Sequence, residues 1–179
     1  MTVVAKAISN GYAMGAVVGS RETMEPAGRM FVSSSYWSDN VGLAASVATI
    51  TELKRRDSER RFREIGAAIT ARLERVLADV GIAGEVVGLE TSPMLSIDSP
   101  DELTQKKIST LFCQEMARRG IYCTLGFIST LAHTQEDIDL TGEAATEVLG
   151  IVKEGLDRGE LDSLIECDMS AEPFRRLVS

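Results

Sequence analysis

The stretch 3-VVAKAISNGYAMGAVVG-19 decides the fold of the first part of this chain. An apolar run meets a single charged residue, Lys6, and a turn with Asn10 and Gly11 leads into a second apolar run. Short apolar runs bounded by turn residues are typical of buried strands with parallel neighbours. The stretch therefore predicts two strands joined through a tight turn, with a lysine at the end of the first strand.

Lys6 has two interpretations when only its spacing is considered. Burial of an ammonium group is costly, so a buried lysine favours its neutral, nucleophilic form, and Schiff-base chemistry requires that form. The alternative is that Lys6 faces solvent near a frayed terminus. Spacing alone favours this second interpretation.

Composition limits the kinds of partner that this chain can have. Its 179 residues are 44% hydrophobic, which is ample for a core. A formal net charge of -8 argues against an electrostatic grip on nucleic acid or on an anionic membrane surface. The sequence has no apolar run near the roughly 20 residues that span a bilayer, and no secretory signal pattern. We expect a cytoplasmic protein with no nucleic-acid and no membrane partner.

Three apolar runs, at 2–5, 15–19 and 30–34, precede the long helices. Buried parallel strands need neighbouring strands, and they need helices on both faces of the sheet. Three strands make an incomplete sheet. We therefore expect either that another chain supplies strands or that this polypeptide is the C-terminal part of a longer protein.

Two helices follow in the pattern. Residues 38–56 are rich in Ala, which predicts a closely packed helix that begins near Ser38 or Asp39. Residues 58–80 carry apolar side chains at three- and four-residue steps, and Gly81 then supplies a stop. The second pattern predicts a helix over 58–80.

The sequence pattern of the C-terminal half predicts a compact α+β unit. Residues 84–100 predict two strands around a proline turn, then a helix over about 100–119 with Ser99 as its N-cap. Residues 120–130 are strand-like, and Thr134 with Asp137 forms a capping box for a last long helix.

Four segments carry a resemblance to a known family. The segments 3-VVAKAISNGYAMGAVVGSRETM-24 and 31-FVSSSYWSDNVGLAASVATITEL-53 resemble the class III aminotransferases, the pyridoxal-phosphate enzymes that include glutamate-1-semialdehyde aminomutase. The segments 111-LFCQEMARRGIY-122 and 132-AHTQEDIDLTGEAATEVLGIVKEGL-156 are similar to the C-terminal small domain of that family. The resemblance covers essentially the whole chain.

The resemblance implies an α/β fold, the C-terminal portion of a fold-type I pyridoxal-phosphate-dependent transferase. Such a portion has an incomplete, mostly parallel large-domain sheet, long connecting helices and a small α+β C-terminal domain. We expect residues 1–56 to be the last part of the cofactor-binding large domain. Residues 57–81 would be a connecting helix, and residues 82–179 the small domain.

The resemblance also implies the site residues. In the family, the lysine that matches Lys6 holds pyridoxal 5'-phosphate as an internal aldimine. Ser35 stands where a family threonine places its hydroxyl on the cofactor phosphate across the dimer interface, and a serine keeps that donor. Tyr36 adjoins it and either lines the cofactor site or packs at an interface. A homodimer with a shared active site is expected.

The implied function is pyridoxal-phosphate-dependent amino-group transfer, as an aminotransferase or aminomutase that uses a small-molecule amino donor and a carbonyl acceptor. Family members are longer at the N-terminus, so we expect a fragment that lacks much of the cofactor site. The alternative is a non-catalytic remnant that acts only in assembly or interaction. The single histidine, His133, precedes a helix N-cap, which favours a structural role over acid–base catalysis. Cys113, Cys123 and Cys167 have the spacing of neither a disulfide framework nor a zinc site.

Overall fold

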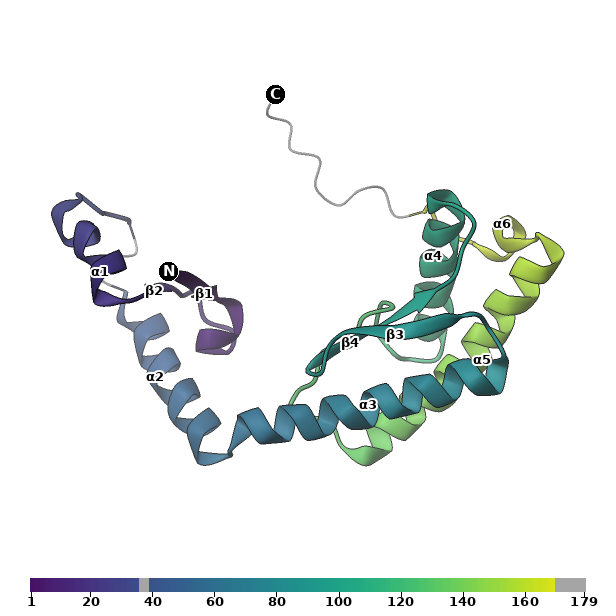
Figure 1. Cartoon of the computed structure of the whole chain (residues 1–179), viewed down its shortest axis with the longest axis horizontal. Helices are drawn as coiled ribbons and strands as arrows, with labels where there is room; N and C mark the ends of the chain where they lie inside the picture. Colours follow the sequence, from purple (N-terminus) through teal and green to yellow (C-terminus); the bar gives the residue numbers. More distant parts are fainter. Residues whose placement is uncertain (36–38, 170–179) are drawn as a thin grey trace, which may run out of the picture. The chain divides into compact units, whose positions relative to one another are not determined.

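A computed structural model describes residues 1–35 and 39–169. The chain divides into two compact units, Met1–Glu59 and Arg60–Ser179. Figure 1 follows the chain through both units, and each is described by itself. In the described residues, no helix is both long enough and apolar enough to cross a membrane.

The first unit opens with a hairpin. Strands β1 (Thr2–Ala5) and β2 (Gly15–Val18) pair antiparallel, with Thr2 opposite Val18. The apolar runs suggested parallel strands, and for this pair that expectation is wrong. A parallel pair needs a crossover of about a dozen residues or more, and the connection from residue 6 to residue 14 is shorter than that.

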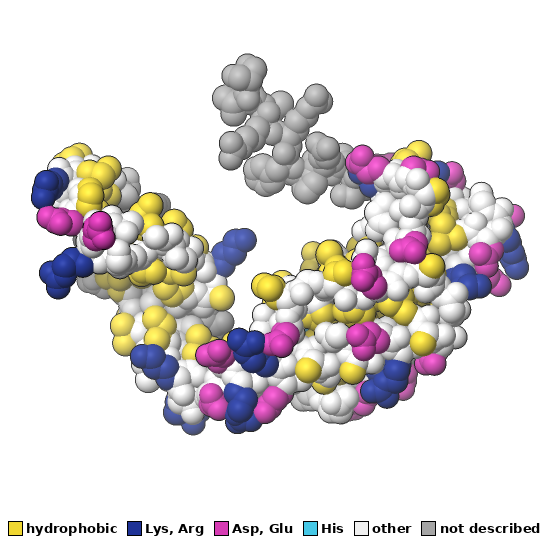
Figure 2. All heavy atoms as spheres, viewed as in Figure 1, with side chains coloured by type: hydrophobic (Ala, Val, Ile, Leu, Met, Phe, Trp, Pro, Cys, Tyr) yellow, Lys and Arg dark blue, Asp and Glu magenta, His cyan; other side chains and the backbone are white. Residues whose placement is uncertain are grey.

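The predicted third strand is also wrong. Residues 30–34 have no regular structure and are exposed, and Phe31 is 95% exposed. Before them lie a short α1 (Arg21–Met24) and a 3-10 helix, η2 (Glu25–Arg29). No hydrophobic side chain is buried among the described residues of this unit, and Figure 2 shows hydrophobic side chains at its surface. The apolar pattern that predicts burial is therefore not matched by burial here.

Helix α2 (Asn40–Arg55) begins where expected. Asp39 is its N-cap, and the Asp39 carboxylate accepts a hydrogen bond from the Val41 backbone N–H at 2.9 Å. The buried residues of this helix are Gly42 and Ser46, and the Ser46 hydroxyl donates to the Gly42 carbonyl at 2.9 Å. Small side chains thus face the rest of the unit, as the Ala-rich pattern predicted.

Helix α3 (Ser58–Val80) confirms the prediction from its three- and four-residue periodicity. It ends where Gly81 adopts a left-handed φ of 65°, a conformation that costs glycine little. Leu73 and Val76 of this helix are almost fully buried in the core of the second unit.

Strands β3 (Gly84–Leu89) and β4 (Ser92–Ile97) form an antiparallel hairpin, with Gly84 opposite Ile97. The turn lies at residues 90–91, so Pro93 sits inside β4 and not in the turn that was predicted to contain it. A proline in a strand lacks an N–H, but its carbonyl can still accept a hydrogen bond.

The strand predicted within residues 120–130 is irregular. The segment nevertheless lies along β4: the Leu95 N–H donates to the Leu125 carbonyl at 2.8 Å, and the Phe127 N–H donates to the Pro93 carbonyl at 2.9 Å. One antiparallel bridge joins Met94 and Gly126. Strand-like pairing is present, but it is too interrupted to form a regular strand.

The remaining helices are α4 (Glu102–Arg118), α5 (Gln135–Arg158) and the short α6 (Leu161–Leu164). The capping box of Thr134 and Asp137 is confirmed. The expected N-cap at Ser99 is wrong, because Asp101 caps α4. The Asp101 carboxylate accepts a hydrogen bond from the Thr104 N–H at 2.8 Å and a second one from the Thr104 hydroxyl at 3.1 Å. A carboxylate that takes two hydrogen bonds is the stronger cap.

One hydrophobic core holds the second unit together. Its members come from α3, β4, α4, α5, α6, the segment after α4 and Ile82 between α3 and β3. The largest of the fully buried side chains are Phe112, Leu73, Leu95, Ile108 and Leu111.

Candidate functional site

Lys6 lies where β1 ends and the 3-10 helix η1 (Lys6–Ser9) begins. The preceding residue, Ala5, is extended, and Lys6 then takes a φ of 58° in the left-handed region. A non-glycine residue in that region is strained by about 1–2 kcal/mol. Strain of this kind gathers at functional sites, and here it falls on the residue for which the sequence suggests chemistry.

The turn after Lys6 contains the residues that the sequence singled out. Asn10 has a φ of 47° and its N–H donates to the Ala7 carbonyl at 3.3 Å, and Gly11 has a φ of 107°. Ser9 is fully buried, and its hydroxyl donates to the Tyr12 carbonyl. These contacts close the loop that follows Lys6.

Helix α2 packs against this loop. A Cβ added to Gly42 would lie 2.5 Å from the carbonyl oxygen of Ala13. That approach is possible only because residue 42 has no side chain. The helix therefore supports the loop that carries Lys6, at backbone-to-backbone distance.

The Lys6 side chain is exposed, as the solvent-facing interpretation of its spacing expected, and the burial suggested by the apolar run does not occur within the described residues. Its ammonium group forms no ion pair and no hydrogen bond with them. Ser35 is also exposed, in the turn before α2, and no hydrogen bond joins it to Lys6 in the described part of the chain. Tyr36, the third predicted site residue, lies outside the described residues.

An aldehyde cofactor that bears a phosphate needs a primary amine to hold it, and hydroxyl or N–H donors for its phosphate. Lys6 offers an amine without a described partner, and Ser35 offers a hydroxyl. In the first unit, Glu25 is engaged in an ion pair with Arg29 at 2.9 Å. The described residues therefore fit the aldehyde and one part of the phosphate.

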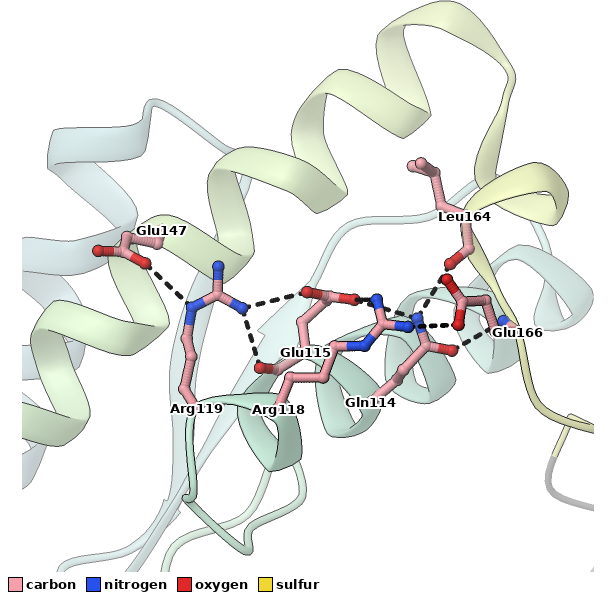
Figure 3. A network of polar contacts seen from close by, with 7 residues as sticks. All are labelled: Gln114, Glu115, Arg118, Arg119, Glu147, Leu164 and Glu166. Carbon is pink, nitrogen blue, oxygen red and sulfur yellow. Dashed lines mark hydrogen bonds and ion pairs between the residues drawn. The ribbon is translucent and has the colours of Figure 1, made fainter.

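A polar network in the second unit was not anticipated from the sequence (Figure 3). Glu115 on α4 is only 7% exposed, and its carboxylate accepts hydrogen bonds from Arg118 at 2.7 Å and from Arg119 at 3.1 Å. Arg119 also donates to Glu147 of α5 at 3.0 Å, and Arg118 donates to Glu166. The spacing of a glutamate three and four residues before two arginines was the available signal.

Burial raises the pKa of Glu115, but hydrogen bonds from Gln114, Arg119 and Arg118 together with the charge of Arg118 outweigh it, and the net pKa lies below the ordinary value. Gln114 extends the network, since its side chain donates to the Leu164 carbonyl at 3.0 Å and accepts from the Glu166 N–H at 2.8 Å. An ionised and satisfied carboxylate stabilises contacts between elements. It is not suited to proton transfer near neutral pH.

The single histidine and the three cysteines lie outside the Lys6 loop. His133 is exposed, and its backbone N–H donates to the Thr130 carbonyl at 3.2 Å, directly before the α5 N-cap. Burial raises the pKa of the Cys123 thiol to about 11 and also raises that of Cys113, while Cys167 is exposed. The described residues contain no group of three or more His, Cys, Asp or Glu side chains that could hold a metal ion.

The sequence is similar to that of known proteins. The family model described as Aminotransferase class-III matches residues 1–149. The chain is 29% identical over 160 residues to the 3-aminobutyryl-CoA aminotransferase of Cloacimonas acidaminovorans, with 87% of this chain and 38% of that protein covered. It is 24% identical over 171 residues to a glutamate-1-semialdehyde 2,1-aminomutase of Nitrosopumilus maritimus, with 86% and 40% covered.

A solved structure shows the same fold. The PLP internal aldimine form of the FumI protein of Sphingopyxis sp. MTA144 has a TM-score of 0.76 and 24% identity, with 87% of this chain and 37% of that chain covered. This chain thus spans about 38% of the length of the proteins that it matches. The expectation of a C-terminal portion of fold-type I, with mixed helix and sheet, agrees with this likeness.

Proposed function

The chain belongs to the class III aminotransferase family, and on that premise we propose that it takes part in pyridoxal-phosphate-dependent amino-group transfer with Lys6 as the residue that holds the cofactor. The observation that carries the proposal is the conformation of Lys6. It is a strained, left-handed residue at the end of a strand, with an exposed amine that has no described partner. Within the loop, Asn10 and Gly11 then turn the chain away from it.

The site residues have different tasks in this proposal. Lys6 holds pyridoxal phosphate through its Nζ atom and, when that amine is free, moves the proton at the α-carbon of the amino donor. The Ser35 hydroxyl donates a hydrogen bond to a phosphate oxygen, and Tyr36 lines the site. When bound, the cofactor supplies the electron sink that makes the α-carbon acidic. The substrates are a small-molecule amino donor and a carbonyl acceptor.

Two copies share the site in this proposal, with Ser35 of each copy serving Lys6 of the other. The exposed apolar side chains of α2, such as Val47 at 68%, support this arrangement. We propose residues 1–56 as large-domain, 57–81 as the connecting helix and 82–179 as the small domain. A cytoplasmic location stays a prediction from composition.

One observation favours a second candidate function. No hydrophobic side chain is buried among the described residues of the first unit. A unit without a core cannot hold a cofactor rigidly by itself. The second candidate is therefore a non-catalytic remnant that acts only in assembly or interaction.

Spectrophotometric titration of the full chain with pyridoxal phosphate tests the proposal. We expect a saturable spectral change that Lys6→Ala abolishes. Lys54→Ala is the matched control, because Lys54 is exposed in the same unit and has no described partner. Ser35→Ala should weaken binding of pyridoxal phosphate about tenfold, since one hydrogen bond to a charged group is lost, and should leave binding of phosphate-free pyridoxal unchanged.

A mixing experiment tests the shared site. Neither Lys6→Ala nor Ser35→Ala should bind cofactor fully alone, but a mixture of the two contains heterodimers with one intact site. Partial recovery of the spectral change supports the shared arrangement. A mixture that equals the average of the two variants contradicts it. A saturable change that survives in Lys6→Ala would contradict Lys6 as the residue that holds the cofactor, and the lack of any saturable change in the wild-type chain would favour the non-catalytic alternative.

A further inference from the structure

The second unit contains a cavity of about 790 Å³ that is separate from the Lys6 loop. It opens between α3, the first turns of α5 and residues 120–133. Sites for small molecules commonly have volumes of about 300–1,000 Å³ and apolar walls. The apolar wall includes Ile69, Leu73, Ile121, Phe127 and Ile138.

Arg72 of α3 lies on this wall and is partly buried. With the described residues its guanidinium forms no hydrogen bond and no ion pair. By contrast, Arg118 and Arg119 of the same unit both carry carboxylate partners. A guanidinium has five N–H donors and no acceptor, so a partly desolvated one without partners needs an anion.

Gly142 of α5 makes room for this side chain. A Cβ added there would lie 2.2 Å from Nε, 2.6 Å from Cγ and 2.7 Å from Cζ of Arg72. Glycine is less favourable than alanine inside a helix, and Gly142 lies within α5. The bare backbone at this position is therefore what allows Arg72 to lie against α5 at the cavity wall.

Two of the polar side chains on the same wall, those of Asp137 and Thr130, are already engaged by the local chain. The Asp137 carboxylate accepts hydrogen bonds from the Thr134 N–H and hydroxyl at 2.8 and 2.7 Å. The Thr130 hydroxyl accepts from the Ala132 N–H at 3.2 Å. Of the Arg and Asp side chains described on this wall, Arg72 is the one left to bind a ligand.

We propose that this cavity binds an amphipathic monocarboxylate, with the carboxylate on Arg72 and an aliphatic chain against Ile69 and Leu73. The planar guanidinium matches a carboxylate in a bidentate arrangement. A ligand with a dianionic phosphate fits less well, because the nearby Asp137 carboxylate repels a second negative charge. This proposal does not depend on the function of Lys6.

Titration calorimetry of the full chain with octanoate tests the site, with 1-octanol and acetate as probes that lack the charge or the chain. Octanoate should bind at millimolar concentration or below, and 1-octanol and acetate should bind more weakly. Arg72→Gln should weaken octanoate binding about tenfold or more and leave 1-octanol unchanged. Arg75→Gln is the matched control on the same helix, since Arg75 is exposed and donates to the Ala71 carbonyl at 3.3 Å.

Gly142→Ala gives a second test that does not rely on the folding of Arg72→Gln. The new methyl group displaces the Arg72 side chain, which is flexible enough to move into solvent, while the helix gains a better helix former. Octanoate binding should fall by a similar factor, and the melting temperature should stay the same or rise. The proposal is overturned if octanoate fails to bind the wild-type chain, or binds Arg72→Gln and Gly142→Ala as it binds the wild type.

Discussion

Gly42 of α2 faces Ala13 so closely that a Cβ on residue 42 would lie 2.5 Å from the Ala13 carbonyl oxygen. This contact holds the helix against the loop that starts at Lys6. Gly42→Ala should therefore separate the helix and the loop at a cost of about 1–3 kcal/mol, which is typical of overpacking.

Hydrogen exchange measures that effect. In Gly42→Ala, the amides of Asn10 and Tyr12, which donate to Ala7 and Ser9 within the loop, should exchange faster than in the wild type. Gly150→Ala is the matched control, because nothing lies within 4 Å of a Cβ at that position. Unchanged protection of both amides in Gly42→Ala would mean that the helix does not support the loop.

The left-handed backbone of Lys6 predicts that one substitution in the loop increases amide protection, whereas Gly42→Ala decreases it. Lys6→Gly removes the steric strain of a φ of 58°, whereas Lys6→Ala keeps it. The loop amides should be protected in Lys6→Gly by about 1 kcal/mol more than in Lys6→Ala. Equal protection in the two variants would show that residue 6 is not strained. Both variants should lose cofactor binding. Lys6→Gly would then make the loop more stable while it removes function, so that residue 6 is kept as lysine at a cost in stability.

Glu115 gives a prediction for pH. Its pKa in the folded chain lies below its ordinary value of 4.5, because of its hydrogen bonds to Gln114, Arg119 and Arg118. The stabilisation is therefore fully present above pH 4.5 and is lost as the pH falls through the lower folded-state pKa. Glu115→Gln should unfold more easily than the wild type at neutral pH, and its stability should fall less below pH 4.5.

Denaturant unfolding at several pH values measures this difference. At neutral pH the loss should be about 1–3 kcal/mol, because Arg118 and Arg119 lose an ionised partner that is largely buried. Glu143→Gln is the control, since Glu143 is exposed on α5 and should change stability by less than about 0.5 kcal/mol. Parallel pH profiles for wild type and Glu115→Gln would contradict the account of the network.

The helices were predictable from local chemistry, and the places where prediction failed have physical causes. The capping box at Thr134 and the glycine stop at Gly81 act within one turn of chain, so the pattern contains them. The choice between Ser99 and Asp101 as a cap depends on hydrogen bonds that sequence spacing does not distinguish. Strand pairing depends on which segments lie on either side of a strand. The antiparallel pairing of β1 and the lack of regular structure at residues 30–34 could therefore not be derived from apolar runs.

The local shape of the loop that carries Lys6 was predictable from the sequence, but the surroundings of the loop were not. A strand, a lysine and a turn with Asn10 and Gly11 were all visible in the sequence, and the structure places the turn residues in the left-handed region. The exposure of Lys6 agrees with the solvent-facing interpretation that its spacing alone favoured. The apolar runs on either side of it predicted burial, because an apolar run indicates that a segment tends to be covered but not what covers it. The pairing of Arg72 with Gly142 joins residues far apart in the chain and left no local signal.

The most direct test of the central claim is to map where pyridoxal phosphate attaches. The full chain is incubated with the cofactor and reduced with borohydride, and its peptides are analysed by mass spectrometry. We predict that the pyridoxyl group is found chiefly on Lys6, with little on Lys54, which is also exposed. Equal labelling of the two lysines, or labelling that leaves Lys6 unmodified, would contradict the assignment of Lys6 as the residue that holds the cofactor.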